Sequence, residues 1–204
     1  AQGLRGAAPA RGHGGAGVNR IEALKQEKDG LDVLEDLARF AREGWKTLGD
    51  DDKERLKWAG VFHRRPTPGH FMMRIRMPNG IVSAAQARLL GEITRQSGRN
   101  VADVTTRQQV QLRWLTMEGV PEVMARLEAA GLTSLQTGMD NIRGIVGCPV
   151  TGLTARELFD TAPIARELRD RPTDRRRSGA ALELPTLALA EPAPDAEALI
   201  VAQG

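Results

Sequence analysis

The chain has 204 residues, enough for one ordinary domain or one and a half, and 41% of them are hydrophobic. Its formal net charge of +3 is modest and by itself indicates no particular partner, because nucleic-acid binding usually shows as a dense basic patch. No apolar run approaches the roughly 18 residues that a membrane span needs, so we expect no membrane partner. A single cysteine, Cys148, excludes an internal disulfide and a four-cysteine metal site, and favours a reducing, cytoplasmic location.

Two helices are predicted before any strand. Apolar residues at helical spacing predict an amphipathic helix over 32–47. Asp50 to Asp52 are suited to cap a short second helix. Pro66 and Pro68 then indicate an extended linker.

A strand and a helix follow the proline linker. Residues 71–77 alternate, with four apolar side chains on one face and Arg74 and Arg76 on the other. Pro78-Asn79-Gly80 predicts a turn. Ser83 is a good N-cap for a helix that Gly98 ends.

The second half of the same unit repeats the pattern. We predict a short strand over 101–105 and a longer one over 109–115, with Val110, Leu112 and Trp114 pointing inward. Pro121 suits the first turn of another helix, which Gly131 stops. A last strand is expected over 132–137. The order is strand, helix, strand, strand, helix, strand (βαββαβ), which predicts an α+β fold of the split ferredoxin-like kind preceded by helices.

The first and third strands of this topology are central neighbours, and their outward residues are strongly polar. These residues are Arg74, Arg76, Gln109, Gln111 and Arg113. Guanidinium groups present a planar fork of donors that matches carboxylates, so the face is suited to bind anions. The alternative is that these side chains are simply solvated, as strand arginines often are.

Other candidate residues have simpler explanations beside the functional ones. Arg107 lies in the tight connection 105–108 between two strands, and a loop arginine is more often a plain surface charge. His63 and His70 have no third ligand, so we expect no metal there. Cys148 is expected to be a small packed residue rather than a reactive thiol.

Three segments resemble signatures of the nitrite/sulfite reductase family. They are Phe71 to Gly80 (FMMRIRMPNG), Thr105 to Trp114 (TTRQQVQLRW) and Thr137 to Arg143. The resemblance covers about three quarters of the chain, from about Asn19 to Arg169. The helical segment before Arg64 and the position of Asp103 look more like the ferredoxin-dependent nitrite reductase branch.

This resemblance implies a half-domain packed beside sirohaem, a tetrapyrrole with eight carboxylates, whose iron is coupled to a [4Fe–4S] cluster. It implies reduction of nitrite or sulfite, with ferredoxin as the expected electron donor. Arg74, Arg107 and Arg143 match arginines around the anion and the sirohaem carboxylates. Thr105 and Gln111 match sirohaem-contacting positions. Arg76, Arg113 and Asn141 rank next.

The chain departs from the family pattern after Leu168. The lysines, the second half-domain and the four cluster cysteines expected there are missing, so we predict an N-terminal fragment that is inactive alone and cannot bind the cluster. The predicted parts are a disordered arm (1–18), a helical segment (19–65), the ferredoxin-like half-domain (66–137), the start of the sirohaem domain (138–170) and a disordered or out-of-frame tail (171–204).

Two alternatives belong to other classes of protein. The RNA-recognition fold shares the same order of strands and helices, but it stacks bases on outward aromatic residues, and here the outward residues are Arg and Gln. We therefore expect no nucleic-acid partner. A non-catalytic interaction module is the other alternative.

Overall fold

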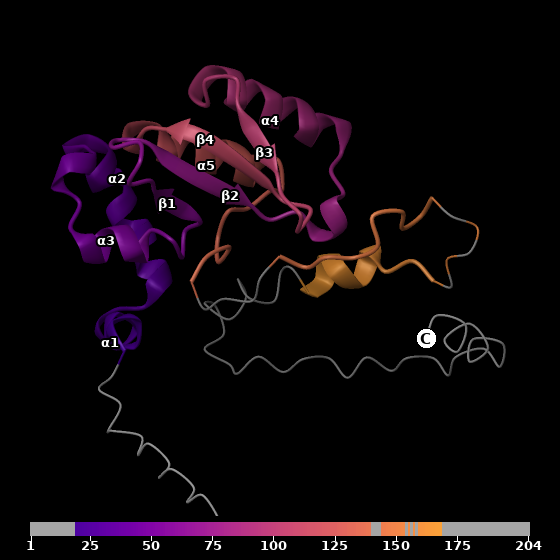
Figure 1. Ribbon diagram of the computed structural model, residues 1–204, viewed down its shortest axis with the longest axis horizontal. Helices are drawn as coiled ribbons and strands as arrows, with labels where there is room; N and C mark the ends of the chain where they lie inside the picture. Colours follow the sequence, from indigo (N-terminus) through magenta and orange to yellow (C-terminus); the bar gives the residue numbers. More distant parts are fainter. Residues whose placement is uncertain (1–18, 140–143, 154, 156, 158, 169–204) are drawn as a thin grey trace, which may run out of the picture.

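The computed structural model describes residues 19–139, 144–153, 155, 157 and 159–168 (Figure 1). The predicted disordered arm and tail lie outside these residues. The N-terminal part is helical and contains α1 (Arg20–Glu27), α2 (Val33–Glu43) and α3 (Asp50–Arg55). None of the described helices is long and apolar enough to cross a bilayer.

The helix predicted over 32–47 is confirmed as α2, which ends where Gly44 adopts a φ of 81°. Its buried residues Val33, Leu37 and Phe40 form the apolar stripe that joins the core. The short second helix is also confirmed, although Gly49 takes the N-cap position and the Asp52 carboxylate accepts a hydrogen bond from the Gly49 N–H at 3.0 Å. Leu56 and Trp58, just after it, are buried.

A four-stranded antiparallel sheet follows, in the order β1-β2-β4-β3. The strands are β1 (Val61–His63), β2 (Phe71–Ile75), β3 (Ala102–Val104) and β4 (Val110–Leu115), and the helices between and after them are α4 (Ala84–Ser97) and α5 (Val120–Ala129). Single 3₁₀ turns are η1 (Gly30–Asp32), η2 (Trp45–Thr47), η3 (Pro78–Gly80) and η4 (Met117–Gly119). The prediction that the first and third strands of the ferredoxin-like unit are neighbours is confirmed by the pairing of β2 with β4.

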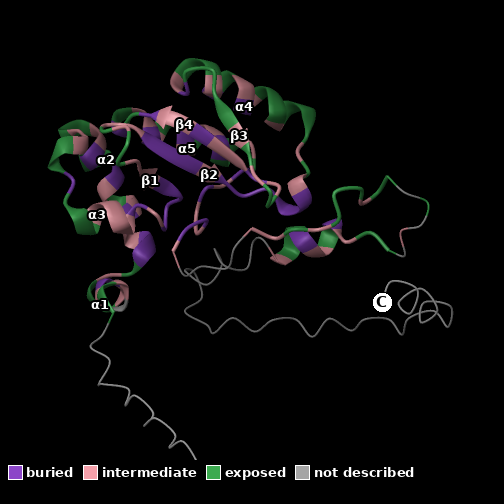
Figure 2. Cartoon of the chain, viewed as in Figure 1, coloured by how far each residue is buried: buried purple, intermediate pink, exposed green. Residues whose placement is uncertain are grey.

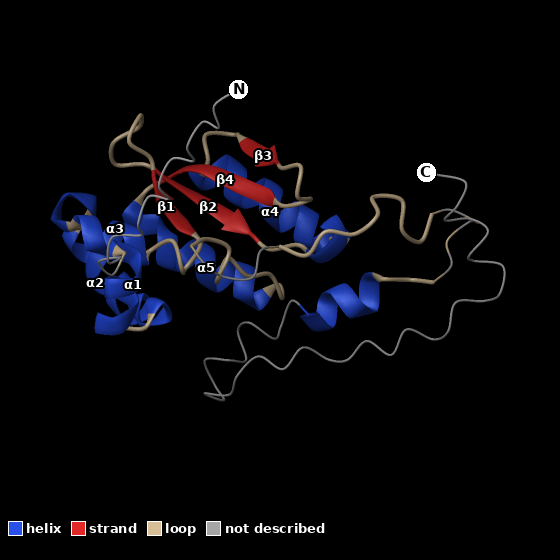
Figure 3. Cartoon of the chain, turned by 60° about the horizontal axis from the view of Figure 1, so that its bottom comes forward, coloured by secondary structure: helices blue, strands red, loops and turns tan. Residues whose placement is uncertain are grey.

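Helices α4 and α5 lie on the same face of the sheet, and the core is buried between them and the strands (Figures 2 and 3). Phe71, Met73 and Ile75 of β2 are each fully buried, as the alternation predicted. Ser83 caps α4 and receives the Gln86 N–H, and Gly98 ends the helix, which confirms both predicted boundaries.

The proline segment and the last strand differ from the prediction. The proline segment is a turn of a β-hairpin rather than a linker, because β1 precedes it and pairs with β2. The last strand is reduced to a single bridge between Arg76 and Thr133. β1 occupies most of the edge of β2 where that strand would have paired, which leaves room for this one contact.

Trp114 was wrongly predicted to point inward. Two residues of β4, Arg113 and Trp114, lie opposite Met72 alone, which is a β-bulge. Trp114 has a φ of 63°, and the alternation shifts so that Leu115 is buried while Trp114 is half-buried. The argument that all strand aromatics point inward therefore fails for this residue.

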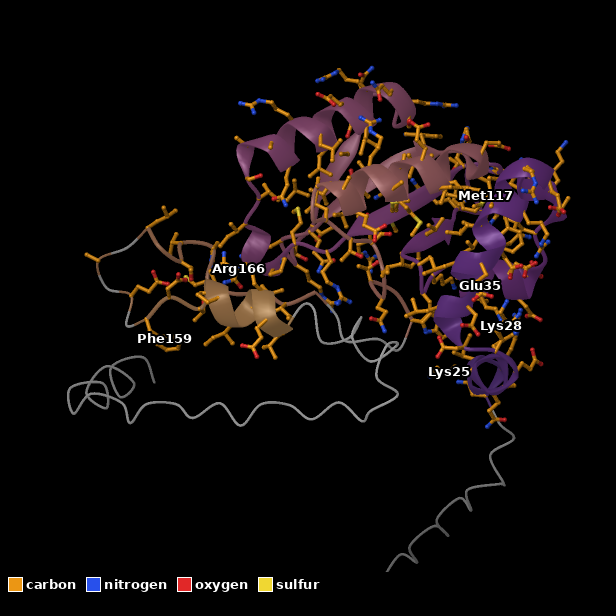
Figure 4. All side chains as sticks on the ribbon, turned by 180° about the vertical axis from the view of Figure 1, so that it is seen from behind. Lys25, Lys28, Glu35, Met117, Phe159 and Arg166 are labelled. Carbon is orange, nitrogen blue, oxygen red and sulfur yellow. The ribbon has the colours of Figure 1, made fainter. Side chains whose placement is uncertain are left out.

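The segment after residue 144 runs past η3 and ends in a short helix over 162–168. A cavity of about 520 Å³ lies between these two stretches, with Val146, Phe159 and Ile164 among its mostly apolar lining residues. Figure 4 shows Phe159 and Arg166 on this segment, on the opposite side of the molecule from Lys25, Lys28 and Glu35 in the N-terminal helices.

Candidate functional site

The sheet face that α4 and α5 do not cover carries a row of polar residues across three strands. Arg74 of β2 lies opposite Gln111 of β4, which in turn lies opposite Asp103 of β3. Residues directly opposite each other share a face of the sheet, so these three side chains are neighbours. The structure therefore confirms that Arg74 and Gln111 lie on one face.

The Arg74 guanidinium is held in place from two sides. Its Nη1 donates to the Thr137 carbonyl oxygen at 3.1 Å, and its carbon lies 5.0 Å from the centre of the Phe62 ring. The Thr137 hydroxyl donates back to the Arg74 carbonyl oxygen at 3.2 Å. This arrangement fixes the direction of the donor fork, which favours binding of an anion without a further loss of side-chain entropy.

Arg76 differs from its neighbour, because the open position predicted for it is wrong. The side chain is only 2% exposed, and Nη2 donates to the Gln136 carbonyl oxygen at 2.6 Å. The segment 133–138 covers it, and Gly60 allows the close approach, since a Cβ there would lie 2.0 Å from the Ser134 carbonyl oxygen. Arg76 is therefore a buried structural cation in the described structure.

Arg113 also has a partner of its own. Its Nε and Nη2 both donate to Oδ2 of Asp103 on the adjacent strand. The pair is partly exposed, with 23% of the Arg113 side chain and 41% of the Asp103 side chain accessible. Asp103 thus neutralises one of the three arginines predicted for the face.

Thr105 and Arg107 lie on the tight hairpin loop that joins β3 to β4. The Thr105 N–H donates to the Gln109 carbonyl oxygen at 2.8 Å, and the Thr105 hydroxyl accepts from the Gln109 N–H at 3.2 Å. These bonds close the loop and leave Arg107 at its tip, exposed to solvent. The loop projects from the same end of the sheet as the C-terminus of β2.

Three amide side chains, two of which the sequence analysis passed over, hold the segment 144–147 against this end of the sheet. The Gln108 amide makes two hydrogen bonds with Gly147, donating to its oxygen at 3.1 Å and accepting from its N–H at 3.3 Å. The Asn79 side chain packs against Gly147, where a Cβ would lie 2.3 Å from its Oδ1, and the main-chain N–H of Asn79 donates to the Ile145 oxygen at 3.2 Å. The Gln109 side chain is 3% exposed and packs so closely on Gly144 that a Cβ there would overlap it.

This amide clasp (Asn79, Gln108 and Gln109) had a signal in the sequence. Gly144 and Gly147 both lack a Cβ, which would collide with Gln109 and Asn79 respectively. A glycine in a loop can indicate that another part of the chain approaches its backbone closely. The open, outward position predicted for Gln109 is wrong, because the segment 144–147 covers it. Its Nε2 is buried without a hydrogen-bond partner, which is costly unless a ligand or water accepts from it.

Asn141 and Arg143, the remaining predicted site residues, lie outside the described residues. Across the part of the chain that is described, no group of three His, Cys, Asp or Glu side chains is placed to hold a metal ion. Cys148, which was expected to be packed, is exposed. The site is thus a cationic and amide surface made by Arg74, Gln111, Thr105 and Arg107.

Comparison with known proteins agrees with this geometry. Residues 63–130 match the Nitrite/Sulfite reductase ferredoxin-like half domain family. The chain is 47% identical over 155 residues to a ferredoxin–nitrite reductase from Leptolyngbya laminosa and 48% identical to one from Synechococcus elongatus. A chloroplastic ferredoxin–nitrite reductase from Spinacia oleracea is 44% identical over 158 residues.

A solved structure shows the same fold. The Mycobacterium tuberculosis NirA protein matches with a TM-score of 0.70 and 31% identity, over 76% of this chain and 32% of that chain. The alignments with the two cyanobacterial relatives cover 75% of this chain and 30% of each relative, so the chain spans about a third of their length. Over residues 63–130 the chain therefore carries the ferredoxin-like half domain of the nitrite/sulfite reductase family.

Proposed function

We propose that this chain is part of a sirohaem-dependent assimilatory nitrite reductase, which reduces nitrite to ammonia with six electrons. The observation that carries the proposal is the fixed Arg74 fork on a sheet face beside Gln111, in a chain 47% identical to a ferredoxin–nitrite reductase. Sulfite is the alternative substrate, because it is also a small oxyanion and the same donors would bind it. Ferredoxin is the proposed electron donor.

The residues present suit a polycarboxylate tetrapyrrole. Arg74 and the exposed Arg107 are cations, Gln111 and Thr105 add neutral donors, and Gln109 contributes a buried amide nitrogen that has no partner. Charged hydrogen bonds to carboxylates contribute about 1.5–3 kcal/mol each. Within this proposal Arg107, Thr105 and Gln111 hold the sirohaem carboxylates, with Arg113, Asn141 and Arg143 as further candidates.

The residues of this chain do not suit the iron–sulfur cluster. A [4Fe–4S] cluster is held by four cysteine thiolates, and the sequence contains one cysteine. No step of the proposed chemistry is therefore assigned to a cluster bound by this chain. We expect the chain alone to be inactive.

The contribution of the chain itself is electrostatic. Bound sirohaem would supply the iron at which the substrate is reduced. Arg74, fixed by the Thr137 carbonyl and the Phe62 ring, would hold the nitrite oxygens and stabilise negative charge as N–O bonds break. Because the fork is already oriented, this stabilisation requires little rearrangement during the reaction.

Binding of sirohaem to the full chain tests the proposal. We expect the Arg107→Ala substitution to raise the Kd for sirohaem by about tenfold, the equivalent of 1.4 kcal/mol, since one charged contact is lost. Arg42→Ala, an exposed arginine on α2, is the matched control and should leave the Kd unchanged. Absorbance titration gives both values. Equal affinities of the two variants and the wild type, or no binding by any of them, would contradict the proposal.

A further inference from the structure

A second polar cluster lies at the other end of the sheet from the Thr105–Gln109 loop. The β1–β2 loop over 64–70, the loop before β3 and the end of β4 meet there (Figure 3). Arg99 joins them, because its Nη2 lies 3.0 Å from Nε2 of His70. A guanidinium only donates, so the His70 ring accepts at Nε2 and carries its proton on Nδ1.

Trp114 is the centre of this cluster, and its position depends on the β-bulge. A regular strand would bury the indole ring, whereas the bulge turns it toward the surface between two loops. The Arg99 guanidinium lies 4.5 Å from the ring centre, and the His70 ring meets the indole edge-on at 5.5 Å. A φ of 63° in an aromatic residue costs about 1–3 kcal/mol and persists only where the surroundings enforce it.

The surroundings of Trp114 are strongly basic. Arg65 and Arg99 are exposed and Arg64, whose N–H donates to the His70 carbonyl oxygen at 3.4 Å, is half-buried. Residues 59–117 contain nine Lys and Arg against two acidic residues, of which Asp103 pairs with Arg113 and Glu92 with Arg126. The exposed Glu118 follows directly after this range, in η4. Asp50 acts on the charge of His63 at the end of β1, and Lys53 pairs with it.

We propose that this tryptophan patch (Arg64, Arg65, His70, Arg99 and Trp114) is a docking surface for a small acidic protein. Tryptophan and arginine are the residues most enriched among those that dominate protein–protein binding energy. The arginines around the ring attract an acidic surface and accelerate encounter. Resting on the proposed function, the partner that fits is the ferredoxin electron donor.

A nucleic acid fits the same surface less well. Single-stranded nucleic acids bind by stacking bases on exposed aromatic faces. Arg99 already covers a face of Trp114, and the His70 ring lies against it. The half-buried indole therefore suits a packed anchor better than a stacking platform.

Charge reversal on the full chain tests the inference, with purified ferredoxin as the probe. We expect Arg65→Glu and Arg99→Glu each to raise the Kd for ferredoxin by roughly tenfold at low salt, and Trp114→Ala to do so at both low and high salt. Arg88→Glu, an exposed position on α4, changes the net charge equally and is the matched control. Its effect should stay under about twofold. Circular dichroism checks the fold of each variant, and Arg65 lies in an exposed turn that tolerates substitution.

The sirohaem titration on the same samples separates the two proposals. Unchanged sirohaem affinity together with weakened ferredoxin binding in the patch variants supports both. If all three charge reversals weaken ferredoxin binding equally, or if the wild type binds no ferredoxin, the docking inference is overturned. In either case sirohaem binding by the wild type still decides the proposed function on its own.

Discussion

The helical segment 19–58 and the sheet unit 59–117 contain the same number of basic residues but use them differently. The helical segment has nine Lys and Arg and eleven acidic residues, and its described cations pair with carboxylates at positions such as Arg20–Asp51, Arg55–Glu27 and Lys57–Glu54. The sheet unit has nine basic and two acidic residues. Arg113 pairs with Asp103, whereas Arg74, Arg76 and Arg99 contact carbonyl oxygens or aromatic rings.

The helical segment thus has basic residues in surface ion pairs, whereas several arginines of the sheet unit are oriented by neutral groups. Exposed pairs such as Arg20–Asp51 contribute little to stability, because water screens them. Cations whose guanidinium groups are held by carbonyl oxygens, such as Arg74 and Arg76, lose freedom of movement before any ligand binds. Such preorganised cations are what a binding site for carboxylates or an acidic protein needs.

The largest effect should come from the buried arginine of the sheet unit. We expect Arg76→Met to lower the free energy of unfolding by about 2–3 kcal/mol, because the buried Arg76 guanidinium no longer donates to the Gln136 carbonyl. Arg42→Met, on the exposed surface of α2, should change it by under about 0.5 kcal/mol. Urea unfolding of the full chain measures both. Similar losses in the two variants would show that the two regions do not differ in this way.

A smaller effect is expected where the sheet unit does contain an ion pair. Asp103→Asn should lower the free energy of unfolding by about 0.5–1 kcal/mol, since the protein partly shields the pair with Arg113 from water. The matched change Asp51→Asn in the helical segment breaks the more exposed pair with Arg20 and should cause no measurable loss. The same denaturation assay applies. A larger loss from Asp51→Asn would reverse the comparison.

The smallest effect concerns His63, which lies where the two regions meet and stacks on Trp45 with ring centres 6.0 Å apart. Burial, together with the charges of Lys53 and Arg65, lowers the pKa of this ring below its usual 6.5. The unfolded chain therefore binds this proton more readily, so the contribution of His63 to stability is present above pH 6.5 and is lost as the pH falls toward the lowered pKa.

His63→Phe keeps an aromatic ring at this position and removes the titration. We expect unfolding experiments to show that, as the pH is lowered from 7 to 5, the free energy of unfolding falls more steeply in the wild type than in the variant. Parallel curves for the two proteins would mean that His63 does not titrate differently on folding.

Local patterns predicted much of this fold, and distant contacts account for the errors. The ends of α4 at Ser83 and Gly98 and the buried face of β2 follow from residues within one element. Three-residue β1 was too short to carry a pattern of its own. The outward turn of Trp114 depends on the pairing of β4 with β2, and the burial of Arg76 depends on a segment about 60 positions away.

The candidate site likewise has features that local patterns predict and features that depend on distant contacts. The placement of Arg74 and Gln111 on one face needed only the period of two along each strand and the order of the strands. For the amide clasp, Gly144 and Gly147 indicate only that something approaches closely, and the identity of the partners depends on Gln108 and Asn79, far away in the chain. The domain boundaries and the roles of Arg107 and Arg143 stay predictions.

The β1–β2 hairpin also has a consequence for the kinetics of folding. Val61 pairs with Met73 across a short turn, whereas Arg74 must find Gln111 after a whole helix has formed between them. Contacts close in sequence lose less chain entropy on closure, so this hairpin is expected to form early and to present the edge on which β4 assembles. The strand predicted over 132–137, after α5, would have paired with the same edge of β2 last. In the structure only the single bridge between Arg76 and Thr133 forms there.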